Sequence, residues 1–485
     1  MPDAIDPNRF SHQSDTNRKR RDLHASNCPG AGVTAGWPPP GVVQASFTWR
    51  SHQTNSHENY STDWIKFMQT RILCKLALSL LLFSTASFAD EEFSQSFNAL
   101  LQQHELPGAV VLVKRGDKTL LYKAYGKVNP KQSTDMQKDA IFRIYSMSKP
   151  ITAVALLQLV DQGKVGLKDD IRKYLPEFKP FEHDGQQQII TIHQLLSHTA
   201  GFGYGGGTKN WIDIRYLLAN PLSRNNSMQD MVNDLSGIDL KFVPGRKFKY
   251  SIASDLQGAI IEAVAKVPLD KYLQQHLFAP LQMKDTSFYV TKGAQHRLVD
   301  MYEYEADTAA EALVFDKSKI SLSETAVKSK YLKKPTFLSG GGGLVSTAAD
   351  YSNFITMLQN KGEFSGKAIL SGAMVEAMLS SHITGLHKHF LPRVYPGAGF
   401  GYGIGIMEVA GGIRNQGSFF WAGLGGTIFW ADPVADLQVL VMMQVEDGWI
   451  ALDRWMTTAV YEMLERTGNS SPRVLESKVQ HPGGR

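Results

Sequence analysis

A serine and a lysine three residues apart are the first candidates for chemistry in this chain. The stretch IFRIYSMSKPIT (141–152) holds Ser146 and Ser148 close to Lys149. Residues i and i+3 share one face of a helix, so Ser146 Oγ can come within hydrogen-bond reach of Lys149 Nζ, whereas Ser148 points elsewhere. A lysine is a useful base for a serine when burial or a second cation lowers its pKa. Ser146 is therefore the candidate nucleophile, although this spacing alone also fits a solvated pair on a surface helix.

Further segments supply groups that such a nucleophile would need. Tyr250 comes just before an apolar helix, after a Pro-Gly turn, in PGRKFKYSIASDLQGAIIEAVA. The Gly-rich segment SFFWAGLGGTIFWADP predicts a strand edge whose backbone N–H groups can face a substrate oxygen.

Three other polar features have plainer interpretations. His198, in LLSHTAG, invites a Ser-His-Asp triad, but the chain has no G-x-S-x-G elbow, so a structural histidine that closes a turn is preferred. The glycine run 340–343 lacks the Lys-Ser/Thr of a phosphate-binding loop and indicates a turn beside the site. Asp255 is expected to cap or anchor the helix after Tyr250 rather than to act in catalysis.

The elements that must position these groups follow from hydrophobic periodicity. Residues 91–105 predict a helix, residues 108–126 a hairpin, and the segment from Ser146 a second helix that runs to about Asp161. The middle, roughly 160–335, is mostly helical with polar, loop-like stretches between the helices. Strands return near the C-terminus and precede an amphipathic helix at 449–466. The expected fold is α+β: an antiparallel sheet formed from both chain ends, flanked by helices, with an inserted mostly helical subdomain.

The ordered motifs give a resemblance that no single one carries. SMSK, LLSHTAGF, PGRKFKYS, PLQMKDTSF, GGGGLVSTAADYSNF and WAGLGGT follow one another across about 100–466. In this order and spacing the chain resembles the serine β-lactamase/penicillin-recognising family, in the branch of class C β-lactamases, D-alanyl peptidases and related esterases.

The resemblance implies a role for each matching residue. Ser146 would be the acylated nucleophile, Lys149 its proton partner, and Tyr250 the tyrosine that shuttles a proton. The backbone N–H groups of Ser146 and Leu424 would form the oxyanion hole, where losing one donor costs about 2.7–4 kcal/mol of barrier.

Two departures from the family pattern favour esters over lactams. The tyrosine motif, normally Tyr-x-Asn, has Ile252 at its third position, and the third motif has Trp421 where a cation or histidine usually stands. Neither side chain can bind a substrate amide or carboxylate, but both suit an apolar acyl or alcohol group. Trp421, Gly423, Ile252 and Tyr204 are therefore the candidate substrate-binding residues, although Tyr204 and Trp421 also fit the core.

The N-terminus predicts export. Met68, the positive residues Arg71 and Lys75, an apolar run at 76–83 and small residues up to Ala89 have the form of a signal peptide. The apolar run is shorter than the roughly 20 residues that a membrane-spanning helix needs. We expect cleavage after Ala89 and a periplasmic or secreted protein, with no stable membrane anchor. Residues 1–67, polar and rich in Pro and Gly, are expected to be a non-native or disordered extension, although the RKRR run within them also fits a localisation patch.

Composition limits the chemistry of the predicted mature domain, 90–485. Both cysteines, Cys28 and Cys74, precede the cleavage point, so disulfides, thiolate catalysis and cysteine metal sites are not expected. Nine of the 51 basic and six of the 46 acidic residues also precede Asp90, which leaves a net charge of +2 and no electrostatic case for nucleic acid.

The sequence therefore predicts an exported serine hydrolase without cofactor or metal that acts on a small-molecule ester or amide, with short-chain or aryl esters preferred. A β-lactamase or D-alanyl-D-alanine carboxypeptidase, and a non-catalytic cell-wall or β-lactam binding protein, are the alternatives. Natural substrate, oligomeric state and the balance of hydrolysis and acyl transfer stay open.

Overall fold

The computed structural model describes residues 67, 68, 70, 71, 90–183, 185–205, 210–304, 317–388, 395–410, 412–446 and 448–467. The chain divides into two units, Met1–Thr70 and Arg71–Arg485, and the first contributes only three helical positions, 67, 68 and 70. Most of the predicted extension, the signal peptide and both cysteines lie outside the described residues, and the predicted domain boundaries stay a prediction. Within the described part, no helix has the combination of length and apolar character that crossing a membrane requires.

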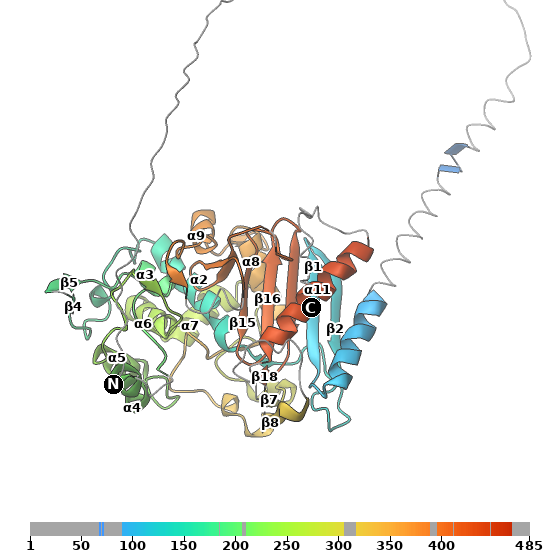
Figure 1. Ribbon diagram of the computed structural model, residues 1–485, viewed down its shortest axis with the longest axis horizontal. Helices are drawn as coiled ribbons and strands as arrows, with labels where there is room; N and C mark the ends of the chain where they lie inside the picture. Colours follow the sequence, from blue (N-terminus) through green and yellow to red (C-terminus); the bar gives the residue numbers. More distant parts are fainter. Residues whose placement is uncertain are drawn as a thin grey trace, which may run out of the picture. The chain divides into compact units, whose positions relative to one another are not determined.

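A seven-stranded antiparallel sheet forms the centre of the second unit (Figure 1). Its strand order is β13-β14-β15-β16-β17-β1-β2, so strands from the C-terminal part pair directly with strands from the N-terminal part. The prediction of one sheet from both chain ends is confirmed. The strands are β13 (Ala398–Phe400), β14 (Gly405–Met407), β15 (Phe419–Gly423), β16 (Thr427–Asp432), β17 (Leu437–Met442), β1 (Ala109–Arg115) and β2 (Lys118–Tyr125).

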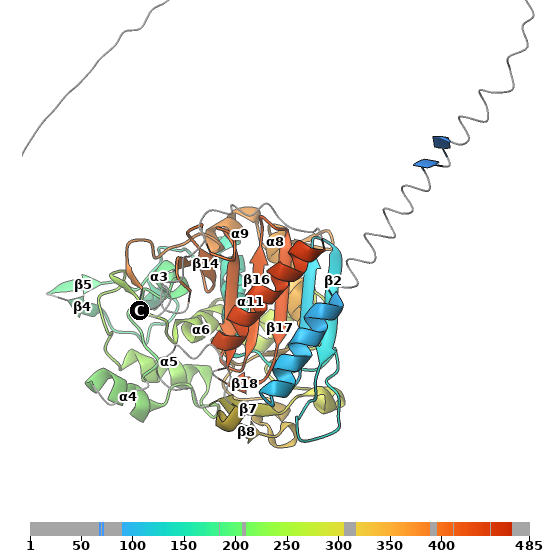
Figure 2. The same cartoon turned by 45° about the vertical axis from the view of Figure 1, so that its right-hand side comes forward.

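Two helices cover one face of this sheet. A helix over residues 90–103 and α11 (Trp449–Arg466) lie side by side across it, as both views show (Figure 2). Phe97 joins the layers, because its ring packs edge-on against Tyr125 of β2 at 5.1 Å and in a tilted orientation against Trp455 of α11 at 5.4 Å. Burial of such aromatic side chains supplies much of the free energy of folding.

The other face carries α8 (Ala348–Gln359) and α2 (Ser148–Asp161). Gln438 of β17 donates to the carbonyl of Ser352 in α8 at 3.2 Å, which fixes this helix against the sheet. Twelve of the 14 residues of α2 are buried, including Lys149. A helix that is buried on all sides is a central element of the core, so its first turn is held rigidly.

The middle of the chain supplies α3 to α7 and several short strands. The helices are α3 (Ile192–Leu196), α4 (Trp211–Ala219), α5 (Met228–Ser236), α6 (Ala253–Ala265) and α7 (Leu269–Leu273), and α9 (Gly372–Met378) follows later. Two-stranded pairs are β3 (Phe142–Arg143) with β9 (Val345–Ser346), β4 (Phe181–His183) with β5 (Gln186–Gln188), β6 (Lys247–Phe248) with β12 (His387–Lys388), and β10 (Glu363–Phe364) with β11 (Lys367–Ala368).

One polar stretch of the middle differs from its prediction. The segment expected to be loop-like contains β7 (Met301–Tyr304) and β8 (Ile320–Glu324), which join β18 (Val445–Glu446) in a three-stranded sheet. The parallel partner β18 comes from far along the chain. The side chains of β8 are exposed or only partly buried, so this strand carries no hydrophobic alternation from which it could be predicted.

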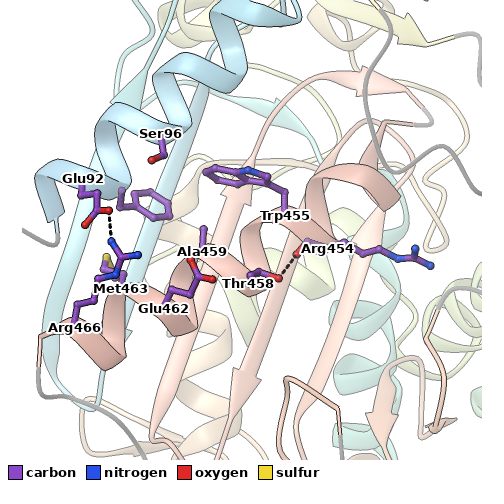
Figure 3. Close-up of a pocket in the computed structure, with 10 residues that line it drawn as sticks. Glu92, Ser96, Arg454, Trp455, Thr458, Ala459, Glu462, Met463 and Arg466 are labelled. Carbon is purple, nitrogen blue, oxygen red and sulfur yellow. Dashed lines mark hydrogen bonds and ion pairs between the residues drawn. The ribbon is translucent and has the colours of Figure 1, made fainter. Parts of the chain in front are cut away.

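The two helices on the outer face border a groove of about 460 Å³ (Figure 3). Phe93 and Trp455 lie in this groove, and Glu92 and Arg466 form an ion pair at one end. Ser146, Lys149 and Tyr250 are not among its lining residues. The predicted chemistry therefore belongs elsewhere in the fold.

Candidate active site

Ser146 lies on a tight turn between β3 and α2. Tyr145, directly before it, has a φ of +41°, a left-handed conformation that non-glycine residues rarely adopt and that costs of order 1–3 kcal/mol. The N–H of Ile144 donates to the carbonyl of Leu344 at 3.0 Å, which anchors the turn from behind. Such strain persists only where surrounding contacts determine the backbone, and here it places Ser146 at the start of a buried helix.

Ser148 has a structural role. Its side chain is completely buried, and its Oγ accepts a hydrogen bond from the N–H of Leu344 at 3.2 Å. This bond ties the first turn of α2 to the end of the glycine run. The two serines of the motif are therefore distinct, because only Ser146 is partly exposed.

Lys149 Nζ contacts the nucleophile directly. It donates to Ser146 Oγ at 3.1 Å and to the carbonyl of Gly341 at 2.6 Å. It also hydrogen-bonds Tyr204 and Tyr250, and it lies 4.6 Å from the centre of the Tyr250 ring. The side chain is 1% exposed, so these groups replace its hydration shell.

Burial and the neighbouring tyrosines act on the pKa of Lys149 in opposite directions. Burial disfavours the ammonium, but attraction to Tyr204 and Tyr250 outweighs it, and the pKa of Lys149 lies above its ordinary value. This raising effect requires negative charge on a tyrosine, because a phenolate attracts the ammonium far more strongly than a neutral phenol does. The cause lies in two tyrosines from distant segments.

Tyr250 receives hydrogen bonds from two donors. The indole N–H of Trp421 donates to its hydroxyl oxygen at 3.2 Å, and Lys149 is the second donor. The rings of Tyr250 and Trp421 lie 5.3 Å apart. Two donors aimed at one phenol oxygen favour its acting as an acceptor.

His198 supports the tyrosine instead of completing a triad. Its Nδ1 accepts from the backbone N–H of Ser251 at 3.1 Å, and its carbonyl accepts from the N–H of Lys249 at 3.0 Å. The imidazole also lies against the Tyr250 ring, with centroids 5.0 Å apart. Burial, followed by repulsion from Lys149, holds the pKa of His198 well below its ordinary value, so the ring is neutral. The structure thus agrees with a structural histidine.

The strand β15 packs directly on the turn that carries Ser146. A Cβ on Gly423 would lie 2.4 Å from the carbonyl oxygen of Ile144, and one on Gly425 would lie 2.8 Å from the Tyr145 ring. Gln444 joins the two segments, because its Nε2 donates to the carbonyls of Arg143 and Gly425 at 3.2 and 3.0 Å. Gly423 therefore has a packing role, and its contact with substrate stays a prediction.

The predicted oxyanion donors face the same space. Ser146 and Leu424 both line one cavity, and among the described residues no backbone carbonyl accepts from the N–H of either. Free N–H groups beside a nucleophile are what an oxyanion hole requires.

This cavity has a volume of about 280 Å³, slightly below the range of drug-sized ligand sites. Ser146 and Tyr250 open into it, and its other described lining residues are Tyr395, Trp421, Ala422, Leu424 and Trp449.

The predicted substrate-binding residues differ in whether they line this cavity. Trp421 lines it, whereas Ile252 is completely buried at the start of α6 and belongs to the core, so its proposed contact with substrate is not what the structure shows. Tyr204 contacts Lys149 rather than this cavity wall. Tyr395 and Trp449 were not predicted, because single aromatic residues outside the motifs carry no signal of their own.

Comparison with known proteins agrees with this geometry. The family model described as Beta-lactamase matches residues 93–461, which is most of the chain. The chain belongs to the beta-lactamase family. This confirms the resemblance drawn from the ordered motifs.

Individual relatives of this beta-lactamase family member include hydrolases. Esterase EstB of Burkholderia gladioli is 28% identical over 381 residues, which cover 76% of this chain and 92% of EstB. Protein Rv1367c of Mycobacterium tuberculosis is 31% identical over 360 residues, covering 70% of this chain and 86% of its own length. Among solved structures, EstCE1, described as a hydrolase with promiscuous acyltransferase activity, matches with a TM-score of 0.65 and 27% identity over 78% of this chain and 99% of its own. The protein is thus a serine hydrolase of the beta-lactamase fold.

Proposed function

We propose that this hydrolase cleaves short-chain or aryl carboxylic esters through an acyl-enzyme on Ser146. The observation that carries the proposal is the aromatic cavity into which Ser146 opens, walled by Tyr395, Trp421 and Trp449. The similarity to Esterase EstB and EstCE1 supports the same class of reaction.

The first half-reaction transfers the acyl group to Ser146. This step requires Tyr250 in its anionic form, and the Trp421 N–H and Lys149 Nζ are the donors directed at its oxygen. It takes the proton of Ser146 as Oγ attacks the ester carbonyl, and the oxyanion lies between the N–H groups of Ser146 and Leu424. The tyrosine then returns this proton to the leaving alkoxide, so an alcohol departs and an ester to Ser146 remains.

The second half-reaction repeats these steps with water. Tyr250 accepts a proton from water, the hydroxide attacks the acyl-enzyme, and the collapsing intermediate expels Ser146 Oγ. Tyr250 gives the proton back to this oxygen, which releases the carboxylic acid and restores the starting state. Lys149 exchanges no proton in this sequence of steps.

Labelling with a fluorophosphonate probe tests the nucleophile. We expect one modified peptide, carrying the adduct on Ser146, and no labelling of Ser146→Ala. An adduct on Ser148 or on any other residue would contradict the proposal.

Substrate comparison separates ester hydrolysis from the lactam and peptide alternatives. Recognition of a β-lactam or D-alanyl carboxylate calls for a cation, and the described lining of the cavity contains none. We expect turnover of p-nitrophenyl butyrate and little of nitrocefin. The reverse would favour a β-lactamase, and unchanged behaviour of Ser146→Ala in every assay would favour a non-catalytic binding protein.

We also propose that the enzyme is exported and acts on a small-molecule substrate outside the cytoplasm. The predicted signal peptide at 68–89 supports this. N-terminal sequencing of the exported protein is expected to begin at Asp90, and a start well upstream would refute it.

A further inference from the structure

A buried carboxylate behind the site has no part in the mechanism above. Asp255 lies in the first turn of α6, 1% exposed, and does not line the cavity. No side-chain cap forms at the start of this helix. Instead, Asp255 Oδ1 accepts from Ser339 Oγ at 2.6 Å and from the N–H of Gly341 at 3.1 Å. A buried charge is costly unless it is compensated, so this arrangement calls for an explanation.

Gly341 connects this carboxylate to the catalytic lysine. Its N–H donates to Asp255, and its carbonyl accepts from Lys149 Nζ at 2.6 Å. One residue of backbone thus links the buried carboxyl group of Asp255 to the buried amine of Lys149.

The glycine run is required for this approach. A Cβ on Gly341 would lie 2.5 Å from Asp255 Oδ2, and one on Gly340 would lie 2.6 Å from the carbonyl oxygen of Ser254. Any side chain at these positions would push the backbone away from the carboxylate. The glycine turn expected beside the site therefore lets the backbone pass closely between Asp255 and Lys149.

The charges around Lys149 come from four segments. Tyr204 and Tyr250 contact it, while His198, which is neutral, and Asp255 interact with it electrostatically. Burial raises the pKa of Asp255, and the hydrogen bond from Ser339 and the charge of Lys149 oppose this rise. Asp255 is the one carboxylate in this set.

We propose that Asp255 is a positioning residue for Lys149: its carboxyl group fixes Gly341, whose carbonyl holds the lysine against Ser146 and Tyr250. This rests on the proposed acyl-enzyme function. Lys149 can stabilise the Tyr250 phenolate only while it is charged and held in place.

The test compares Asp255→Asn with Ser339→Ala. The first variant keeps the shape and an acceptor oxygen but removes the charge, whereas the second removes one hydrogen bond to the same oxygen and keeps the charge. The measurements are kcat and KM for p-nitrophenyl butyrate from pH 6 to 10.5, with thermal unfolding to verify the fold.

For Asp255→Asn we expect kcat to fall by about tenfold or more with little change in KM. The alkaline limb of kcat/KM is expected to move to lower pH, since loss of a carboxylate near Lys149 favours the neutral amine. Ser339→Ala should lose at most a few-fold in kcat and keep its alkaline limb. A folded Asp255→Asn whose kcat and alkaline limb match those of Ser339→Ala would overturn the proposal.

Two further variants cover the remaining outcomes. If Asp255→Asn does not fold, the exchange Asp255→Ser with Ser339→Asp restores the carboxylate on the other side of the same hydrogen bond. Activity with a wild-type alkaline limb in this exchange variant supports the proposal, and a folded variant lacking either contradicts it. Ser146→Ala distinguishes failure of the positioning proposal from failure of the proposed function, because full activity of this variant would refute the acyl-enzyme function itself.

Discussion

The indole N–H of Trp421 offers a direct measure of the charge that develops on Tyr250. Trp421→Phe removes the hydrogen bond of 3.2 Å to the tyrosine oxygen while keeping an aromatic ring in the cavity wall. A hydrogen bond to a charged group is worth about 1.5–3 kcal/mol, against about 0.5–1.5 kcal/mol for a neutral pair. At 1.36 kcal/mol for each tenfold in rate, loss of a donor to a phenolate lowers kcat by about 10- to 150-fold.

The assay is steady-state hydrolysis of p-nitrophenyl butyrate by Trp421→Phe and Trp449→Phe. Trp449 lines the same cavity and makes no described contact with Tyr250, so its replacement measures the effect of a changed wall. We expect Trp421→Phe to lower kcat and Trp449→Phe to act mainly on KM. An unchanged kcat in Trp421→Phe, with only KM raised, would show that the tryptophan is a wall residue and that the reasoning about the phenolate is wrong.

Three further predictions concern the cavity, the strand behind it and the buried histidine. Trp449→Ala should raise the kcat/KM ratio of p-nitrophenyl octanoate to butyrate by about tenfold or more, since each methylene in a hydrophobic pocket is worth about 1–3 kcal/mol; an unchanged ratio would remove Trp449 from the acyl subsite. Gly423→Ala should abolish activity, because its Cβ would meet the Ile144 carbonyl, whereas Gly293→Ala, with no heavy atom within 4 Å, should keep both kcat and Tm. Because the pKa of His198 is lowered in the native state, this histidine becomes protonated near pH 6.5 in the unfolded chain but stays neutral in the native state. The free energy of unfolding is therefore highest above that pH, and below it this histidine lowers it by about 1.4 kcal/mol per pH unit. Urea titrations from pH 8 to 5 should show this decrease in the wild type and a smaller decrease in His198→Gln.

The order and spacing of the motifs predicted the three central residues of the site. Ser146, Lys149 and Tyr250 were identified from spacing and context, and the structure brings them together. The prediction for Ile252 failed because adjacency to a catalytic tyrosine does not reveal direction. The turn into α6 rotates this side chain into the core.

The other features of the site depend on how closely segments that are far apart in the sequence approach one another in the fold. The charge of Lys149 depends on Tyr204 and Tyr250, and its anchor depends on Asp255 through Gly341. No periodicity in the sequence reports how closely such segments approach. The walls formed by Tyr395 and Trp449 likewise belong to no motif, so only folding shows that they face Ser146.

The pairing of β1 with both β2 and β17 constrains the time course of folding. Val113 lies opposite Val439, so the sheet stays open on one side of β1 until Leu437–Met442 has been synthesised. A nascent chain shorter than this presents a hydrophobic strand with an unpaired edge, a feature that promotes aggregation. Contacts of such sequence separation also slow the search for the native state. The central sheet can therefore close around β1 only after β17 has been synthesised.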